Sequence, residues 1–112
     1  MKIQVKSGEQ GAELITLQGD LDFHSATQLR TELIKFAERQ AQKILVDLKK
    51  VTYIDSSGLA AFVELFQSMK RYSGKLVLFN LTQGVRNVFE IAKLDAIFKL
   101  ARDEKEALSL LS

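Results

Sequence analysis

The sequence predicts a single α/β domain with a mixed, mostly parallel sheet of about five strands and about four helices. Short apolar runs rich in β-branched residues alternate along the chain with segments whose apolar residues recur at helical spacing. One run, KILVDL at residues 43–48, is compact in the way that a strand buried on both faces requires. Because this alternation implies right-handed crossovers, we expect helices to pack against the sheet. The length of 112 residues fits one domain, which we expect to span residues 1–112.

The first half of the chain is predicted to contain a hairpin of two strands, a helix and the central strand. The two short extended runs, the second ending at Asp20, are separated by SGEQG at residues 7–11, which indicates a hairpin. Ser25 then precedes apolar residues on one helical face, and Gln28 follows three positions later as in a capping box. We therefore expect a helix over residues 26–39 with Ser25 as its N-cap.

The second half continues the same alternation. VTYI at residues 51–54 extends the central strand to Asp55, and after Gly58 the apolar residues return at helical spacing. The residues of this second helix that we expect to face the core are Leu59, Phe62, Val63, Phe66 and Met69. The remaining elements are expected as a strand at 76–79, a helix after the N-cap Thr82, an extended run at 97–100 and a helix after Asp103.

Composition argues against several classes of function. The sixteen basic and fourteen acidic residues are scattered without a basic cluster, so direct nucleic-acid binding is not expected. The chain has no cysteine and one histidine, His24, so no thiolate or histidine-rich metal site and no cofactor are expected. Its start lacks the apolar core of a signal peptide, and no run approaches the roughly 20 apolar residues of a membrane span. We predict a cytoplasmic protein that does not bind membranes and is a monomer when free.

The stretch VTYIDSSGL at residues 51–59 is the most informative for function, because the central strand ends there at an acid, two serines and a glycine. Loops at the carboxyl ends of parallel strands commonly carry function in α/β folds. Ser56 and Ser57 lack the flanking glycines of a hydrolase nucleophile elbow, and His24 is the only histidine that could serve as their base. Catalysis by either serine is therefore not expected.

Two other interpretations of this edge of the sheet follow from residue types alone. Asp20, Asp22 and Asp55 could hold Mg²⁺ or Ca²⁺, but the ligand ladder of an EF-hand is missing, and solvated loop acids and helix caps explain them more simply. Ser56 or Ser57 can cap the helix that begins near Gly58, which explains one hydroxyl and leaves the second unexplained. No glycine-rich phosphate-binding motif accompanies them.

The chain resembles the STAS domain of bacterial anti-sigma factor antagonists, the central component of partner-switching systems. The resemblance covers nearly the whole chain and is carried by GDLD at residues 19–22, ILVDL at 44–48 and YIDSSGL at 53–59. One departure is Ala60, where relatives often carry glycine, so there is slightly less room at the start of the second helix. This departure bears on the identity of the partner and not on the fold.

The resemblance implies a non-enzymatic switch. Its unphosphorylated form is expected to bind an anti-sigma factor that is also a serine kinase of the histidine-kinase-like ATPase fold, which frees the sigma factor. Phosphorylation is expected on Ser56, with a metal-dependent serine phosphatase to reverse it. The resemblance places Asp55, Ser57 and Gly58 in the phosphorylation turn and Asp22 at the partner-facing edge.

Ala61 and Leu65 are further candidates for partner binding. On a helical wheel they lie on a flank beside the core face of the second helix, so they belong either to a wide core or to a docking surface. Two other functions remain open: a STAS subunit of a signalling scaffold or lipid-transport complex without a kinase partner, and a small serine hydrolase. For the switch, we expect a phosphate on Ser56 to leave the domain folded and to act through repulsion and desolvation in the complex.

Overall fold

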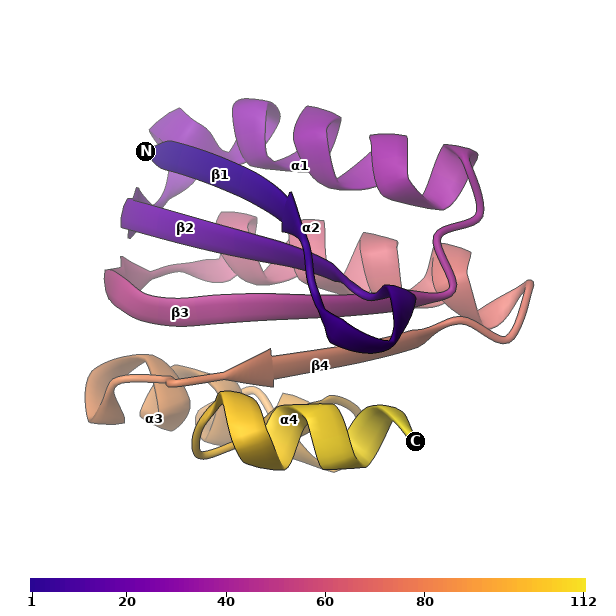
Figure 1. Ribbon diagram of the computed structural model, residues 1–112. Helices are drawn as coiled ribbons and strands as arrows, with labels where there is room; N and C mark the ends of the chain where they lie inside the picture. Colours follow the sequence, from indigo (N-terminus) through magenta and orange to yellow (C-terminus); the bar gives the residue numbers. More distant parts are fainter.

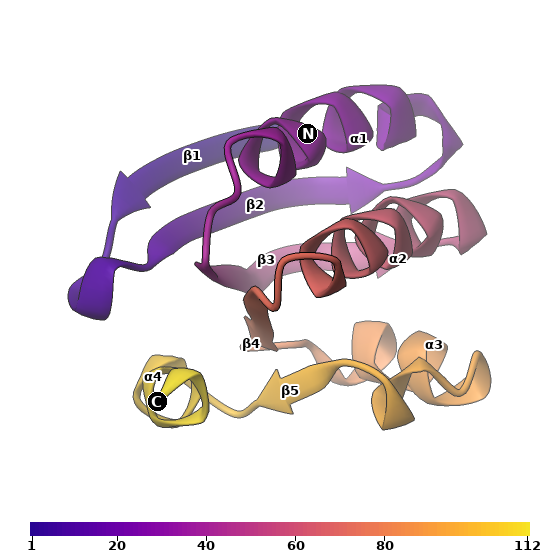
Figure 2. The same ribbon diagram turned by 90° about the vertical axis from the view of Figure 1, so that its right-hand side faces the viewer.

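The computed structural model describes residues 1–112 and contains one five-stranded sheet in the order β1-β2-β3-β4-β5 (Figures 1 and 2). The strands are β1 Lys2–Ser7, β2 Glu13–Leu21, β3 Lys43–Ile54, β4 Lys75–Phe79 and β5 Lys99–Ala101. The helices are α1 Phe23–Glu38, α2 Ser56–Lys70, α3 Gln83–Ile91 and α4 Glu104–Leu111, with short 3-10 turns at Glu9–Gly11 and Leu94–Ala96. β1 is antiparallel to β2, and all other neighbouring strands are parallel, so the predicted class and element order are confirmed.

The sheet separates a large core from a small one. α1, α2 and α3 pack on one face, and α4 packs on the other face over β4 and β5 (Figure 2). Successive residues of the central strand point to opposite sides, so Leu45 enters the small core and Val46 the large one. Both are fully buried, as the compact run in the sequence predicts for a central parallel strand. None of the helices combines the length and apolarity that crossing a membrane requires.

The first helix begins at Phe23, and the expectation that Ser25 is its N-cap is wrong. Asp22 is the N-cap, and its carboxylate accepts hydrogen bonds from the backbone amides of His24 at 3.0 Å and Ser25 at 3.1 Å. The Ser25 hydroxyl in turn accepts from the Asp22 amide at 3.0 Å, which completes a capping box one turn earlier than expected. Both residue types cap well, and the aspartate is the one placed where the strand ends.

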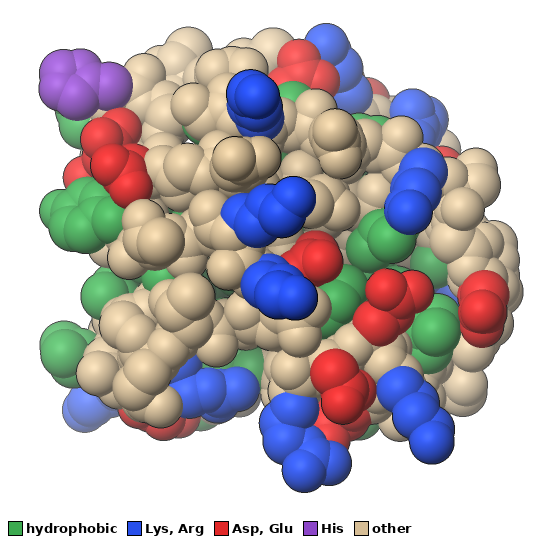
Figure 3. Space-filling view, turned by 60° about the vertical axis from the view of Figure 1, so that its left-hand side comes forward, with side chains coloured by type: hydrophobic (Ala, Val, Ile, Leu, Met, Phe, Trp, Pro, Cys, Tyr) green, Lys and Arg blue, Asp and Glu red, His purple; other side chains and the backbone are tan.

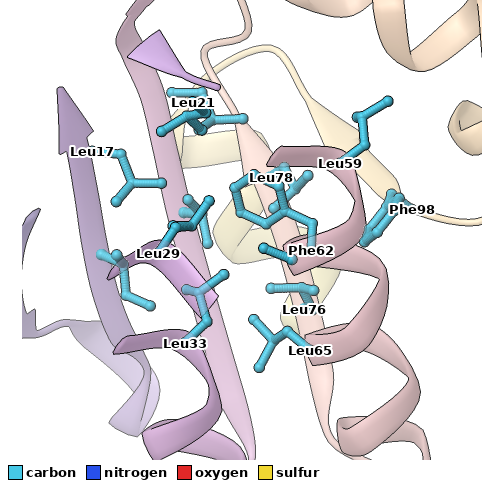
Figure 4. Packing of buried hydrophobic residues seen from close by; sticks show 14 of the residues in the cluster. Leu17, Leu21, Leu29, Leu33, Leu59, Phe62, Leu65, Leu76, Leu78 and Phe98 are labelled. Atoms are coloured by element: carbon cyan, nitrogen blue, oxygen red, sulfur yellow. The ribbon is translucent and has the colours of Figure 1, made fainter. Parts of the chain in front are cut away.

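The buried face of α2 is wider than the predicted one. Leu59, Phe62 and Met69 are buried as expected, but Val63 and Phe66 are only half-buried, and the flank residues Ala61 and Leu65 are 4% and 1% exposed. α2 packs against α1 as well as the sheet, and this second contact buries the flank (Figure 4). The assignment of Leu65 to partner binding is therefore wrong, because its side chain lies in the large core.

The carboxyl-terminal elements largely follow the prediction. The Thr82 hydroxyl accepts from the Val85 amide, and the Asp103 carboxylate accepts from the Glu106 amide, so both residues are the N-caps expected for α3 and α4. The last strand begins at Lys99 and not at residue 97. The reason is that a 3-10 turn occupies Leu94–Ala96 and the Phe98 side chain is buried in the large core.

Candidate functional site

Asp55 is the N-cap of α2 and fixes the turn that contains the two serines. Its Oδ1 atom accepts hydrogen bonds from the backbone amides of Ser57 at 2.9 Å and Gly58 at 3.3 Å. The expectation that Ser56 or Ser57 caps this helix is therefore wrong. A carboxylate directly after the strand satisfies two of the free amides at the helix start, which leaves both hydroxyls available for other roles.

Asp55 also ties this turn to the neighbouring turn between β2 and α1. Its Oδ2 atom accepts from the Phe23 amide at 3.2 Å, and its own amide donates to the Leu21 carbonyl oxygen at 3.2 Å. Gly58 faces the same turn so closely that a Cβ atom there would clash with the Leu21 carbonyl oxygen and lie 2.9 Å from Ile54 Cγ1. The Asp55 carboxylate thus links the amino termini of α1 and α2. They can lie this close together because Gly58 has no side chain.

The two serines differ in their surroundings. Ser56 is exposed at the first position of α2, whereas Ser57 is half-buried and faces a shallow groove between α1 and α2. Neither hydroxyl makes a hydrogen bond within the chain; only the backbone of Ser57 is engaged, through its amide. Ser56 therefore offers a free, solvent-facing hydroxyl on a turn whose backbone is fixed by its neighbours.

The groove has a volume of about 270 Å³ and a floor of small side chains, Ala26, Ala60 and Ala61. Ala61 is buried, with 4% of its surface exposed, but it lines this groove and Leu65 does not. The ion pair between Arg30 Nε and Glu64 Oε2, 2.6 Å apart, joins the two helices at the edge of the groove.

Two exposed aromatic residues beside the turn were missed by sequence reasoning. Phe23, at the start of α1, is 75% exposed, and Tyr53, near the end of β3, is 52% exposed. The buried face of α1 carries Leu29, Leu33 and Phe36. Phe23 lies off this face, so helical periodicity does not predict that it is buried. An aromatic residue outside the period and next to an acid was the available signal, and exposed aromatics of this kind are common at interfaces.

Asp20, Asp22 and Asp55 do not form a metal site. The carboxylates of Asp22 and Asp55 are used as helix caps, and Asp20 Oδ1 accepts from the Thr52 hydroxyl at 3.3 Å. No three metal-ligating side chains come together in the structure. His24 is exposed, with acidic side chains beside it at this edge (Figure 3), and its ring packs against Phe23 at 5.9 Å between centroids.

The hydrogen bonds that Asp22 accepts as a helix cap also shift its ionisation. The hydrogen bond from the Ser25 amide, with smaller contributions from the His24 amide and the Ser25 hydroxyl, lowers the pKa of Asp22 below its ordinary value of 3.8. A lowered pKa in the folded state means that the ionised cap stabilises the protein above the unfolded-state pKa. This stabilisation is lost as the pH falls through the folded-state pKa.

We expect Asp22→Asn to remove this acid dependence while it keeps a cap, because asparagine also accepts from helix amides. The free energy of unfolding of the wild type should fall more steeply than that of the variant below about pH 4. Urea denaturation of both proteins between about pH 5 and pH 2 measures the difference. Parallel curves for the two proteins would contradict a role for the charged cap.

The fold and the site define a small α/β domain in which two adjoining helix amino termini present an exposed serine at the carboxyl edge of the sheet. The family model for the STAS domain matches residues 5–107. The chain belongs to the STAS domain family.

The chain is similar to known relatives and to solved structures. The chain is 34% identical over 101 residues to the anti-sigma-B factor antagonist of Bacillus subtilis (strain 168), covering 90% of this chain and 91% of that protein. The crystal structure of an anti-sigma factor antagonist from Mycobacterium paratuberculosis superposes with a TM-score of 0.88 at 18% identity, over 98% of this chain and 92% of that one. Phosphorylated SpoIIAA from Bacillus superposes with a TM-score of 0.75 at 22% identity, over 99% of this chain and 100% of that one. At these identities, the two structures bear on the fold alone.

Proposed function

We propose that this protein is an anti-sigma factor antagonist controlled by phosphorylation of Ser56. The unphosphorylated form binds an anti-sigma factor that is also a serine kinase, which frees the sigma factor, and a metal-dependent serine phosphatase restores that form. The observation that carries the proposal is the free, exposed Ser56 hydroxyl on a turn fixed by Asp55 and Gly58. The relative at 34% identity, named an anti-sigma-B factor antagonist, supports the same function. On this proposal the protein is a substrate and a binding partner, and not an enzyme.

The local geometry explains why a phosphate on Ser56 acts on the complex and not on the fold. The amides of Ser57 and Gly58 already donate to Asp55, so they are not available to a phosphate on the same turn. The phosphate, with a charge of about −1.5 to −2, then stays in solvent beside the Asp55 carboxylate. Docking of a partner must desolvate both anions, and this cost opposes binding. SpoIIAA, whose fold is similar, has been solved in both unphosphorylated and phosphorylated forms, which supports a switch without unfolding.

The proposed partner surface combines residues that shape it and residues that contact the partner. Asp22, Asp55 and Gly58 hold the backbone of the two turns in place. The contacting side chains are proposed to be Phe23, Tyr53, Ser56, Ser57 and the floor residue Ala61. Aromatic anchors commonly dominate the energetics of such interfaces, so the largest contribution is expected from Phe23.

We expect Phe23→Ala to raise the Kd for the anti-sigma kinase at least about tenfold, because truncation removes an exposed aromatic anchor. The melting temperature should stay within about 2 °C of the wild type, since most of the ring lies outside the core. Calorimetric titration of the unphosphorylated protein with its kinase measures the affinity. The matched control is Ile91→Ala, because Ile91 on α3 is also exposed, at 83%, and lies outside the proposed surface. An equal loss in both variants would contradict the assignment of Phe23.

The proposal as a whole is tested by incubating the protein with its cognate histidine-kinase-like ATPase and ATP, and locating the phosphate by mass spectrometry. We expect one phosphate on Ser56 and none in the Ser56→Ala variant. A stable complex without phosphorylation would favour the alternative of a STAS subunit in a scaffold or transport complex. Ester hydrolysis that is lost in Ser56→Ala would instead favour the hydrolase.

A further inference from the structure

A hollow of about 410 Å³ opens where α2 ends and β4 and β5 begin. Its apolar lining comes from Phe66 and Met69 of α2, Leu76 of β4 and Ile97, which lies just before β5. At a rise of 1.5 Å per residue, the length of α2 separates this hollow from Ser56 by about 20 Å. The hollow is therefore distinct from the proposed partner surface.

The walls of the hollow are preformed but adaptable. Ile97 is 50% exposed, and the half-buried Phe66 ring packs edge-on against Phe98 with 5.4 Å between ring centroids. This contact fixes the orientation of one wall. The floor includes Met69, whose flexible thioether can shift to fit an apolar group. The volume lies within the range typical of sites for small molecules.

All charged side chains that line the hollow are cationic. Lys70, Lys75 and Lys99 line it, and no acidic residue does. The four ion pairs of the structure involve other residues, so none of these three lysines is neutralised by a carboxylate. Lys75 Nζ donates to the Leu111 carbonyl oxygen at 3.1 Å, whereas Lys70 and Lys99 make no hydrogen bond through their ammonium groups. An apolar lining beside two lysines that form no ion pair and no ammonium hydrogen bond is complementary to an apolar molecule with a negative end.

We propose that this hollow binds a small amphipathic anion, a medium-chain acyl or aryl carboxylate. Its apolar part lies against Phe66, Met69 and Ile97, where it removes exposed apolar surface from water. Its carboxylate lies between Lys70 and Lys99, which supply charge-assisted hydrogen bonds. A positively charged amphiphile of the same length would fill the same apolar space. It would bind more weakly, because the three lysine side chains repel its charge.

The test uses octanoate, with octylammonium as a probe of equal chain length and opposite charge. Each is titrated into ¹⁵N-labelled protein, and amide shifts are followed by NMR. Octanoate is expected to shift amides of the lining residues and to bind at least about tenfold more tightly than octylammonium. The double variant Lys70→Glu/Lys99→Glu should reverse this preference. The control Lys2→Glu/Lys50→Glu changes the net charge equally, at exposed lysines of β1 and β3, and should keep it.

Three results would overturn the proposal. Octanoate could leave the amides of the hollow unshifted, or octylammonium could bind as tightly as octanoate. The Lys2 and Lys50 control could also lose as much affinity for octanoate as the Lys70 and Lys99 variant, which would mean that net charge alone explains the effect. Phosphorylation of Ser56 and kinase binding by these variants are measured separately, so a failure here leaves the proposed function standing.

Discussion

Ser56→Asp is expected to weaken binding to the anti-sigma kinase by at least about a hundredfold, while Ser56→Ala keeps the affinity within about threefold of the wild type. The two variants are expected to differ because the interface is proposed to accommodate a neutral hydroxyl. An aspartate brings a charge that must be desolvated without a partner, and an uncompensated buried charge costs about 3–5 kcal/mol. Alanine removes a hydroxyl that makes no hydrogen bond within the chain.

The groups that could neutralise the charge of Ser56→Asp are partly engaged already. The amides of Ser57 and Gly58 at the start of α2 donate to Asp55. Arg30, which lines the groove, is paired with Glu64. The new carboxylate therefore adds to the Asp55 charge, and the repulsion should appear in the complex and not in the stability of the free domain.

Calorimetry of the two variants with the kinase measures this effect, and thermal unfolding shows that both variants fold. The matched control is Ser7→Asp, which adds the same charge at an exposed serine that ends β1, on the edge strand of the sheet. It should bind like the wild type. Wild-type affinity in Ser56→Asp, with the control unchanged, would contradict the proposal that charge at this hydroxyl controls binding.

Periodicity and turn chemistry predicted most of the fold but not the details of the two functional turns. Strand runs and helical spacing place every strand and every α-helix, and Thr82 and Asp103 are the expected caps because each directly precedes the apolar residues of its helix. Around Asp22 and Asp55 an acid and serines stand within a few residues of each other. Only the backbone geometry decides that the acids cap and that the Ser56 hydroxyl stays free.

The flank of α2 shows a second limit of sequence reasoning. A helical wheel finds the apolar residues of one helix but cannot show how many neighbours that helix has. Contact with both the sheet and α1 buries Leu65, while Ala61 lies at the base of the groove. The hollow beside Ile97 depends on packing between elements distant in sequence, and no local pattern encodes it.

Gly58→Ala is expected to lower the free energy of unfolding by about 2–3 kcal/mol, in the range seen when a packed site is overfilled. The backbone of Gly58 is helical, so the cost comes from contact and not from its dihedral angles. The added Cβ atom would clash with the Leu21 carbonyl oxygen and lie 3.0 Å from the Leu21 Cβ atom. Backbone atoms of two packed elements cannot yield as a flexible side chain would, so the two turns must separate.

Separation of the turns should also affect function, because Asp55 links them through the Phe23 amide. We therefore expect Gly58→Ala to weaken kinase binding beyond the fraction of unfolded protein. The control is Gly84→Ala on α3, where an added Cβ atom has no neighbour within 4 Å. Alanine there should leave stability unchanged or raise it by up to about 1 kcal/mol through helix propensity. Urea denaturation compares the two variants; equal midpoints for wild type and Gly58→Ala would mean that close contact between the turns is not what requires glycine at this position.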